Sequence, residues 1–177
     1  MVRQWIRGGK LLRVIKKDQI MDDDWQRIDE GANPDSYPDG DILISLTAWK
    51  EHRATLLERN GKVAVYLKGE EDPADLVPDL DHFEMIALDF PVFKDGRSYS
   101  NARLLRERYG FGGELRAVGD VLRDQIYFMQ RCGIDSYQVR ADKDIEDAMN
   151  GFKDFSVTYQ TATDGTLPVY KRRNPGV

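Results

Sequence analysis

The feature that most constrains the fold is a regular alternation of short apolar runs with longer amphipathic stretches. The runs begin near residues 41, 62, 83, 114 and 136, and helical spacing of apolar side chains follows each of them. Repeated strand-helix units form parallel sheets with right-handed crossovers. Five or six units are too few to close an eight-stranded barrel. We therefore predict an α/β fold of five to six mostly parallel strands, arranged as an open sheet or a partial (half) TIM-like barrel.

The N-terminal part of the chain does not follow this alternation. Residues 4–15 hold two short apolar runs around Gly8-Gly9, a pair suited to a tight turn, and predict a hairpin. The stretch that follows is rich in Asp, Pro, Asn and Gly and predicts a connecting arm with at most one short helical turn, near Trp25 and Ile28. Residues 155–160 predict a last strand. We divide the chain into an N-terminal hairpin and arm (1–40), one α/β domain (41–160) and a flexible tail (161–177).

The composition favours a protein of a reducing compartment. The chain has 26 basic and 31 acidic residues, so its net charge of −5 does not favour nucleic acid or an anionic membrane as partner. Cys132 is the only cysteine, which excludes an intramolecular disulfide and a cysteine-based metal cluster. No apolar stretch is long enough to span a membrane, and the first residues lack the apolar core of a signal peptide. We expect a cytoplasmic protein without metal or cofactor, and with neither nucleic-acid nor membrane partners.

Candidate functional residues follow the third and fourth apolar runs. In a parallel sheet the carboxyl ends of the strands meet at one edge, and α/β proteins bind their ligands there. Arginine suits oxyanions, and the start of a helix favours an anion. No catalytic residue is assigned. The candidate ligand-binding residues are Asp89, Asp95, Arg97, Tyr99, Ser100, Arg116, Asp120 and Arg123.

Several of these residues also have a plain structural interpretation. Ser100 and Asp120 are most simply N-caps of the helices that follow them. Asp89 is either a structural hydrogen-bond acceptor or a site group. The arginines of residues 103–108 are typical of a solvated helix face. Cys132 lies on the apolar side of its predicted helix, three residues after Met129, and is interpreted as a buried, inert thiol.

The central part of the chain, residues 87–139, resembles the bacterial family called domain of unknown function 934. The elements that carry the resemblance are DFPVFKDGRSYSNARLLRERYG, GELRAVGDVLRDQ and RCGIDSYQ. Members are often labelled probable oxidoreductase involved in sulfite reduction, and their genes commonly lie beside those for assimilatory sulfite reductase. The resemblance therefore implies a role in sulfur assimilation and cysteine biosynthesis. It supplies no established catalytic residues.

Two functions are compatible with these observations. The first, implied by the resemblance, is an accessory protein that docks to sulfite reductase or supports it. The second is a small enzyme or sensor that binds an oxyanion or phosphorylated ligand at the strand ends through Arg97, Arg116 and the helix start at Ser100. The oxidoreductase label leaves enzymatic activity open, because no flavin or nicotinamide loop is visible. A homodimer is a further expectation, because open sheets expose unpaired edges.

Overall fold

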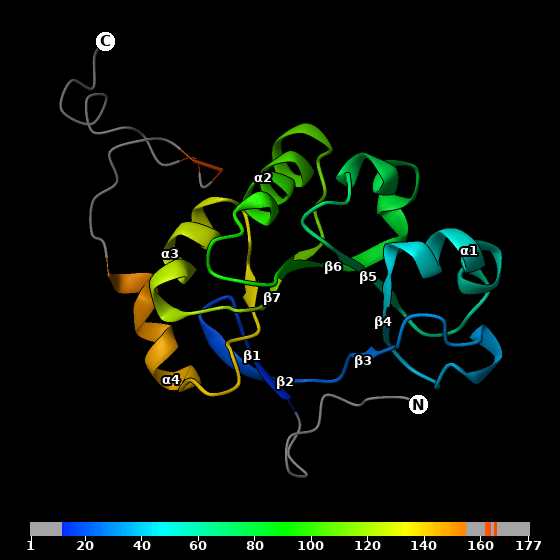
Figure 1. The fold of residues 1–177 in the computed structure, drawn as a ribbon, viewed down its shortest axis with the longest axis horizontal. Coiled ribbons are helices and arrows are strands. Elements are labelled where there is room, and N and C mark those ends of the chain that lie inside the picture. Colours follow the sequence, from blue (N-terminus) through cyan, green and yellow to red (C-terminus); the bar gives the residue numbers. More distant parts are fainter. Residues whose placement is uncertain (1–11, 155–161, 164, 166–177) are drawn as a thin grey trace.

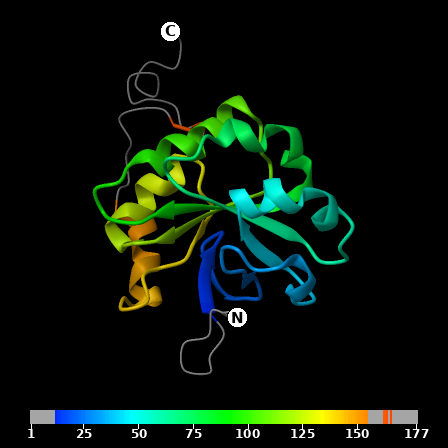
Figure 2. The ribbon, with the colours of Figure 1, turned by 45° about the vertical axis from the view of Figure 1, so that its right-hand side comes forward.

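The described part of the chain contains eight strands in one open, strongly curled sheet (Figures 1 and 2). The computed structural model of the protein describes residues 12–154, 162–163 and 165. The strands lie in the order β2-β1-β8-β7-β6-β5-β4-β3. Their bounds are β1 Leu12–Lys16, β2 Gln19–Asp23, β3 Gln26–Arg27, β4 Ile42–Ser45, β5 Val63–Leu67, β6 Phe83–Phe90, β7 Glu114–Gly119 and β8 Ser136–Tyr137.

The strands from β3 to β8 run parallel to one another, whereas β1 pairs antiparallel with both β8 and β2. The predicted α/β class and the mostly parallel strands are confirmed, and the curled sheet has the shape of a half-barrel. The predicted number of five to six strands is too low. The missing strands come from the N-terminal segment, where short polar stretches pair with the sheet although their composition indicates a connecting arm.

The described residues contain a hairpin of β1 and β2, which overlaps the predicted hairpin of residues 4–15 only at residues 12–15. β1 and β2 are joined by Lys17 and Asp18, whose φ angles of 48° and 61° are those of a tight hairpin turn. The predicted arm contains β2 and β3, and the helical turn predicted near Trp25 and Ile28 is wrong, because β3 lies there; the 3-10 helix of this segment is η1 at Pro34–Ser36. Residues 4–11 of the predicted hairpin, the predicted strand at 155–160 and most of the predicted tail lie outside the described residues.

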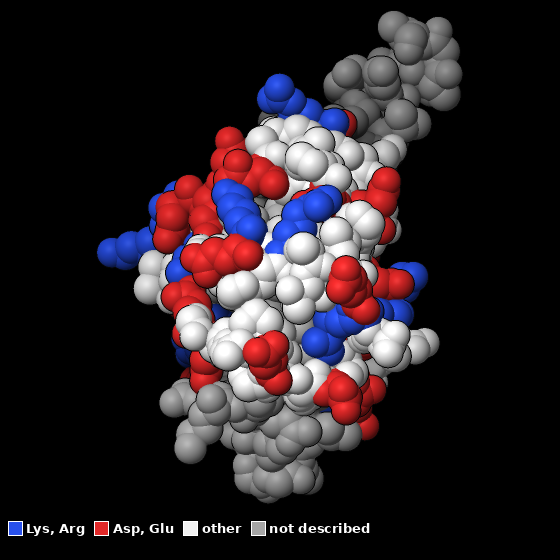
Figure 3. Space-filling model, turned by 90° about the vertical axis from the view of Figure 1, so that its right-hand side faces the viewer, with Lys and Arg blue, Asp and Glu red and all other residues white. Residues whose placement is uncertain are grey.

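The helices cover the convex face of the sheet (Figures 1 and 2). No helix of the described residues has the length and apolar character that crossing a membrane requires. On the face that carries α1, acidic and basic side chains are intermixed (Figure 3). The helical bounds are α1 Leu46–Leu57, η2 Pro73–His82, α2 Arg97–Arg103 with its π-helical continuation η3 Leu104–Arg108, α3 Arg123–Arg131, α4 Ile145–Ala148 and η4 Met149–Lys153.

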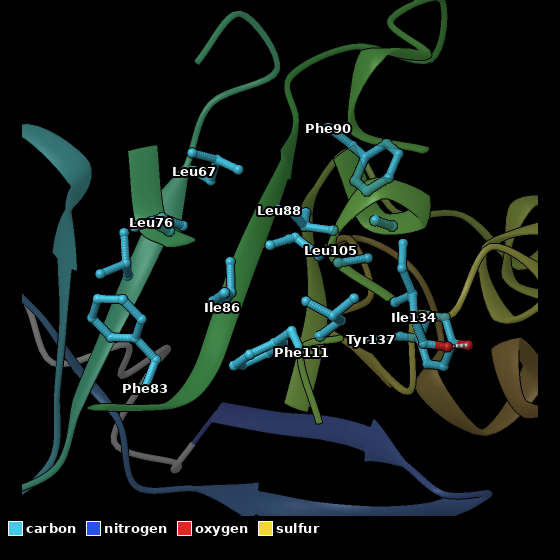
Figure 4. Packing of buried hydrophobic residues seen from close by; sticks show 14 of the residues in the cluster. Leu67, Leu76, Phe83, Ile86, Leu88, Phe90, Leu105, Phe111, Ile134 and Tyr137 are labelled. Carbon is cyan, nitrogen blue, oxygen red and sulfur yellow. Dashed lines mark hydrogen bonds between the residues drawn. The ribbon is translucent and has the colours of Figure 1, made fainter. Parts of the chain in front are cut away.

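The main hydrophobic core lies between the convex face and the helices (Figure 4). Successive side chains of a strand point to opposite faces, so Ile86 and Leu88 of β6 enter this core while Ala87 between them faces the concave side. Leu105 of η3 is fully buried against the same core. A second, smaller apolar cluster, which includes Tyr66 and Ala87, lines the concave face.

The concave face is contacted by the segment that joins the two edges of the sheet. β2 and β3 are the edge strands, yet only two residues separate them, so their ends are within about 10 Å of each other. Asp23 is ion-paired with Arg116, and Trp25 packs against the concave apolar cluster. This short link explains why the sheet curls so strongly.

Candidate functional site

The loops that follow β6 and β7 begin side by side at one edge of the sheet, here called the rim. Phe90 and Gly119 are register partners, and the main-chain N–H of Asp120 donates to the carbonyl of Phe90 at 2.7 Å. Gly119 has a φ of 98°, and a Cβ atom there would lie 2.5 Å from that carbonyl oxygen, so glycine allows the close approach. The parallel sheet thus brings the two predicted loops together.

Asp89 lies at the end of β6 on the concave face. The phenol of Tyr66 donates a hydrogen bond to the Asp89 carboxylate, and the Cζ atom of Arg27 lies 4.2 Å from the centroid of the Tyr66 ring. Burial raises the pKa of Asp89, and the Tyr66 hydrogen bond and the Arg27 charge oppose this only in part. Burial, and next the contact with Asp89, also raise the pKa of Tyr66. We call Asp89, Tyr66 and Arg27 the concave cluster, as distinct from the apolar cluster on the same face.

Replacing Asp89 by asparagine is expected to stabilise the protein at neutral pH. A carboxyl whose pKa is raised by folding contributes most to stability below the pKa of an unfolded aspartate, about 4, and that contribution is lost as the pH rises through the folded pKa. Asparagine keeps a polar partner for Tyr66 and does not ionise. Thermal unfolding between about pH 3 and pH 8 checks this. A variant less stable than the wild type at pH 7 would show that the ionised carboxylate has a structural role.

Arg116 lies in the middle of β7 on the concave face, within a row of alternating charges. Its Nη1 atom is 2.7 Å from Asp23 Oδ1, and its Nη2 atom is 2.8 Å from Glu114 Oε1. Lys16 Nζ lies 2.5 Å from the other oxygen of Glu114. The side chains of Arg116, Glu114 and Asp23 are 4%, 7% and 5% exposed. We call these four residues the buried charge row. It holds the N-terminal hairpin against β7.

The two carboxylates of the buried charge row differ in their electrostatics. Burial raises the pKa of Asp23, and Arg116 offsets this only in part. Burial would also raise the pKa of Glu114, but Arg116, Lys16 and the Ser136 hydroxyl outweigh it, and the pKa lies below its ordinary value. Arg116 therefore neutralises protein carboxylates, and an external anion would have to compete with both of them.

Asp95 and Arg97 form a closed pair in the loop after β6. The Nε and Nη2 atoms of Arg97 donate to the two carboxylate oxygens of Asp95 at 2.9 and 2.6 Å. Hydrogen bonding to Arg97 lowers the pKa of Asp95 to about 2. Arg97 also lies 3.5 Å from Glu70. The geometry is the bidentate one that guanidinium prefers, with a protein carboxylate in the place where an external oxyanion was predicted.

The predicted N-cap role of Ser100 is wrong. The helix α2 begins at Arg97, and Gly96 occupies its N-cap position, so Ser100 is an exposed residue inside the helix. The hydroxyl of Ser98, which is buried, instead donates to the main-chain oxygen of Asp89. The turn after β6 ends before Ser100, because α2 already begins at Arg97. The hydrogen bond from Ser98 to Asp89 connects the start of α2 with the end of β6.

The predicted N-cap role of Asp120 is also wrong. The helix α3 begins at Arg123, and the Gln125 side chain accepts a hydrogen bond from the N–H of Leu122 at 2.9 Å. Asp120 is free to point away from the helix and accepts from Arg140 Nη1 at 2.6 Å, across the end of β8. This ion pair joins the loop after β7 to the segment after β8 at the rim.

The last two candidates lie on the helix side of the sheet, away from the concave cluster. Arg123 is ion-paired with Asp147 at 2.8 Å and with Asp154 at 3.1 Å, which connects α3 with α4 and η4. The ring of Tyr99 packs against Phe128 of α3, with 5.0 Å between centroids. Burial raises the pKa of Tyr99 to about 12. Tyr99 is thus a packing residue of the α2–α3 contact.

Large apolar side chains stand exposed next to this contact. Val92 and Phe93 in the loop after β6 are 56% and 58% exposed, and Phe128 on α3 is 54% exposed. Both ribbon views place that loop beside α3 (Figures 1 and 2). We call Val92, Phe93, Tyr99 and Phe128 the apolar rim surface. Such a surface is typical of a site that contacts another molecule.

Sequence reasoning missed the partners of Asp89 and Arg116. Tyr66 was part of an apolar strand, and Asp23 and Arg27 were part of the predicted arm. The sequence feature that could have revealed Asp23 and Arg27 is the spacing of Asp23, Trp25 and Arg27. Side chains at every second position of an extended chain point to the same side, so these three would face the sheet together. All three contact the concave face.

Within the described ranges, no group of three or more His, Cys, Asp and Glu side chains is arranged to hold a metal ion. Cys132 is buried at the end of α3, and burial raises the pKa of its thiol. A thiol in this state is a poor nucleophile at neutral pH. This agrees with its interpretation as a packing residue.

Residues 64–170, more than half of the 177 residues, match the family described as bacterial protein of unknown function (DUF934). The matched span includes β6 to β8 and the apolar rim surface, whereas Asp23 and Arg27 precede it. Comparison with curated proteins and with solved structures gave no match. The family resemblance of the DFPVFKDGRSYSN stretch is confirmed, and the chain belongs to this family of bacterial proteins of unknown function.

Proposed function

We propose that the protein is a non-catalytic accessory protein of assimilatory sulfite reduction, which docks onto sulfite reductase through the apolar rim surface. The observation that carries this proposal is the exposure of Val92, Phe93 and Phe128 on neighbouring elements at one edge of the molecule. Phenylalanine is enriched at protein interfaces relative to the rest of the protein surface. Exposure of these three apolar side chains to water does not stabilise the folded state.

The choice of partner rests on the family resemblance. Val92 and Phe93 fall inside DFPVFKDGRSYSN, one of the elements that carry it. The resemblance implies a place beside sulfite reductase in sulfur assimilation. The exposed loop is therefore the part of the structure in which the family motif and a docking surface coincide.

The ion pairs weigh against the alternative, a small enzyme or sensor for an oxyanion or phosphorylated ligand. Arg97, Arg116 and Arg123 each contact protein carboxylates at between 2.6 and 3.1 Å. An anionic ligand would have to displace these carboxylates, which would then repel it. The helix start at Ser100, the other part of that proposal, lies inside α2.

Replacing Val92 and Phe93 together by serine is expected to weaken binding to sulfite reductase at least about tenfold, because each is an exposed apolar contact residue. Biolayer interferometry with the purified proteins measures this. Val77→Ser, which removes a 42% exposed apolar side chain from η2, is the matched control and should bind like the wild type. Equal binding by the double variant, or no binding by the wild type, would contradict the proposal.

A deletion strain gives the cellular counterpart of this test. The strain should grow on sulfide or cysteine and poorly on sulfate or sulfite, and the Val77→Ser variant should restore growth where the double variant does not. Calorimetry with sulfite, sulfate and phosphate tests the alternative. Binding that is lost in Arg97→Ala would favour the oxyanion site, and self-association through the same loop would favour the homodimer.

A further inference from the structure

The apolar rim surface is bordered by two exposed side chains of opposite charge. Lys94 directly follows Phe93 in the loop after β6. Asp124 belongs to the first turn of α3, four positions before Phe128, so these two side chains lie on the same face of the helix. Burial raises the pKa of Tyr99 most, and the charge of Asp124 adds to this, which places the carboxylate near the Tyr99 ring. The loop border of the surface is therefore cationic and the α3 border is anionic.

Neither of these two charges is used inside the folded chain. Among residues 12–154, 162–163 and 165, the side chains of Lys94 and Asp124 have no ion-pair or hydrogen-bond partner. Their neighbours Arg97 and Arg123 are paired with protein carboxylates at between 2.6 and 3.1 Å. A paired charge must lose its own contact before it can bind a second molecule, whereas an unpaired charge gains an ion pair on binding. Lys94 and Asp124 are therefore available to a second molecule.

The two borders of the apolar rim surface complement each other. The loop carries Val92, Phe93 and a positive charge, whereas α3 carries Phe128 and a negative charge. Both ribbon views place the loop beside α3 (Figures 1 and 2). In a two-fold dimer every contact occurs twice, because each copy offers the same surface to the other. A two-fold axis between the loop and α3 would set the loop of each copy against α3 of the other.

We propose that a second copy of this chain covers the apolar rim surface when the protein is free. In this dimer Lys94 pairs with Asp124 of the partner subunit, and Phe93 packs against Phe128 of the partner subunit. The dimer removes the exposed apolar side chains from water, which favours association. Its consequence rests on the proposed function, because sulfite reductase would contact the same surface. The second copy and the reductase therefore exclude each other, and the reductase must displace the second copy in order to dock.

Two charge reversals test this geometry. Lys94→Asp sets like charges against each other at both ion pairs of the dimer, and so does Asp124→Lys. Each variant alone should self-associate at least about tenfold more weakly than the wild type. An equal mixture of the two variants should recover the association, because positions 94 and 124 of one variant then meet opposite charges on the other. A role of these residues within a single chain predicts no recovery on mixing.

Sedimentation equilibrium of the full-length protein between about 1 μM and about 1 mM measures the self-association, and the wild type should dimerise with a Kd of about 0.1 mM or tighter. At about 0.15 M salt, the repulsion that arises from the net charge of −5 is screened beyond about 8 Å. Lys62→Glu and Glu84→Lys reverse the charges of an exposed pair near the starts of β5 and β6, and each should associate like the wild type. A monomeric wild type, unchanged association of the reversals at 94 and 124, or a mixture that stays monomeric would overturn the proposal.

This measurement contains no sulfite reductase, so its failure would leave the docking proposal intact. Docking is tested separately by adding an excess of sulfite reductase to the wild-type dimer, which should be replaced by single copies bound to the reductase. If the dimer forms and recovers in the mixture, but the reductase does not reduce it, the dimer stands and docking through this surface is contradicted.

Discussion

Replacing Arg116 by leucine is expected to lower the free energy of unfolding by about 3–5 kcal/mol. The guanidinium contacts Asp23 at 2.7 Å and Glu114 at 2.8 Å, and all three side chains are almost fully buried. Without it, Asp23 keeps its desolvation cost and loses its neutralising partner. Urea unfolding at pH 7 measures the loss. An unchanged free energy of unfolding would show that the buried charge row does not hold the hairpin against β7.

The pH dependence and two companion variants make this result specific. Burial already raises the pKa of Asp23 in the wild type, and loss of Arg116 should raise it further. The Arg116→Leu variant should therefore be closest to the wild type below about pH 4, where unfolded carboxylates are protonated, and fall behind as the pH rises. Adding Asp23→Asn and Glu114→Gln should recover much of the loss. Arg13→Leu, which removes an exposed arginine paired with Glu146, should change little.

Replacing Phe90 by alanine is expected to cost about 3–5 kcal/mol and to weaken docking as well. Phe90 ends β6, is 1% exposed and meets Tyr99 edge to face, with 4.9 Å between centroids. A cavity at this position would remove the support under the apolar rim surface. Thermal unfolding and the sulfite reductase binding measurement report the two effects separately.

Phe93→Ala is the matched control, because it removes the same side chain three positions later from an exposed site. Its stability should stay within about 0.5 kcal/mol of the wild type while its docking is impaired. Equal stability of the two variants would show that the rim does not depend on the end of β6. If Phe90→Ala lost docking and Phe93→Ala kept it, the exposed loop would not be the docking site.

The sequence by itself determined the class of the fold, because strand and helix periodicities are local properties. The apolar run that begins near residue 83 predicts a strand, and β6 begins at Phe83. The alternation of strands and helices also implies that β6 and β7 pair in parallel, so their carboxyl ends lie side by side. The predicted caps show the limit of local reasoning. Ser100 and Asp120 had the right residue type for an N-cap, but Ser98 and Gln125 made the contacts at the two helix starts.

Only the tertiary structure decided which charged groups meet. Asp23 and Arg116 are 93 residues apart, and their contact depends on the curl of the sheet that brings the edge hairpin onto β7. The segment that carries Asp23, Trp25 and Arg27 is polar, so its composition indicates an arm, although it contacts the concave face. Long-range ion pairs are set by where the strands lie in space, and an arginine in the sequence does not reveal whether its partner is a ligand or a carboxylate of the same chain.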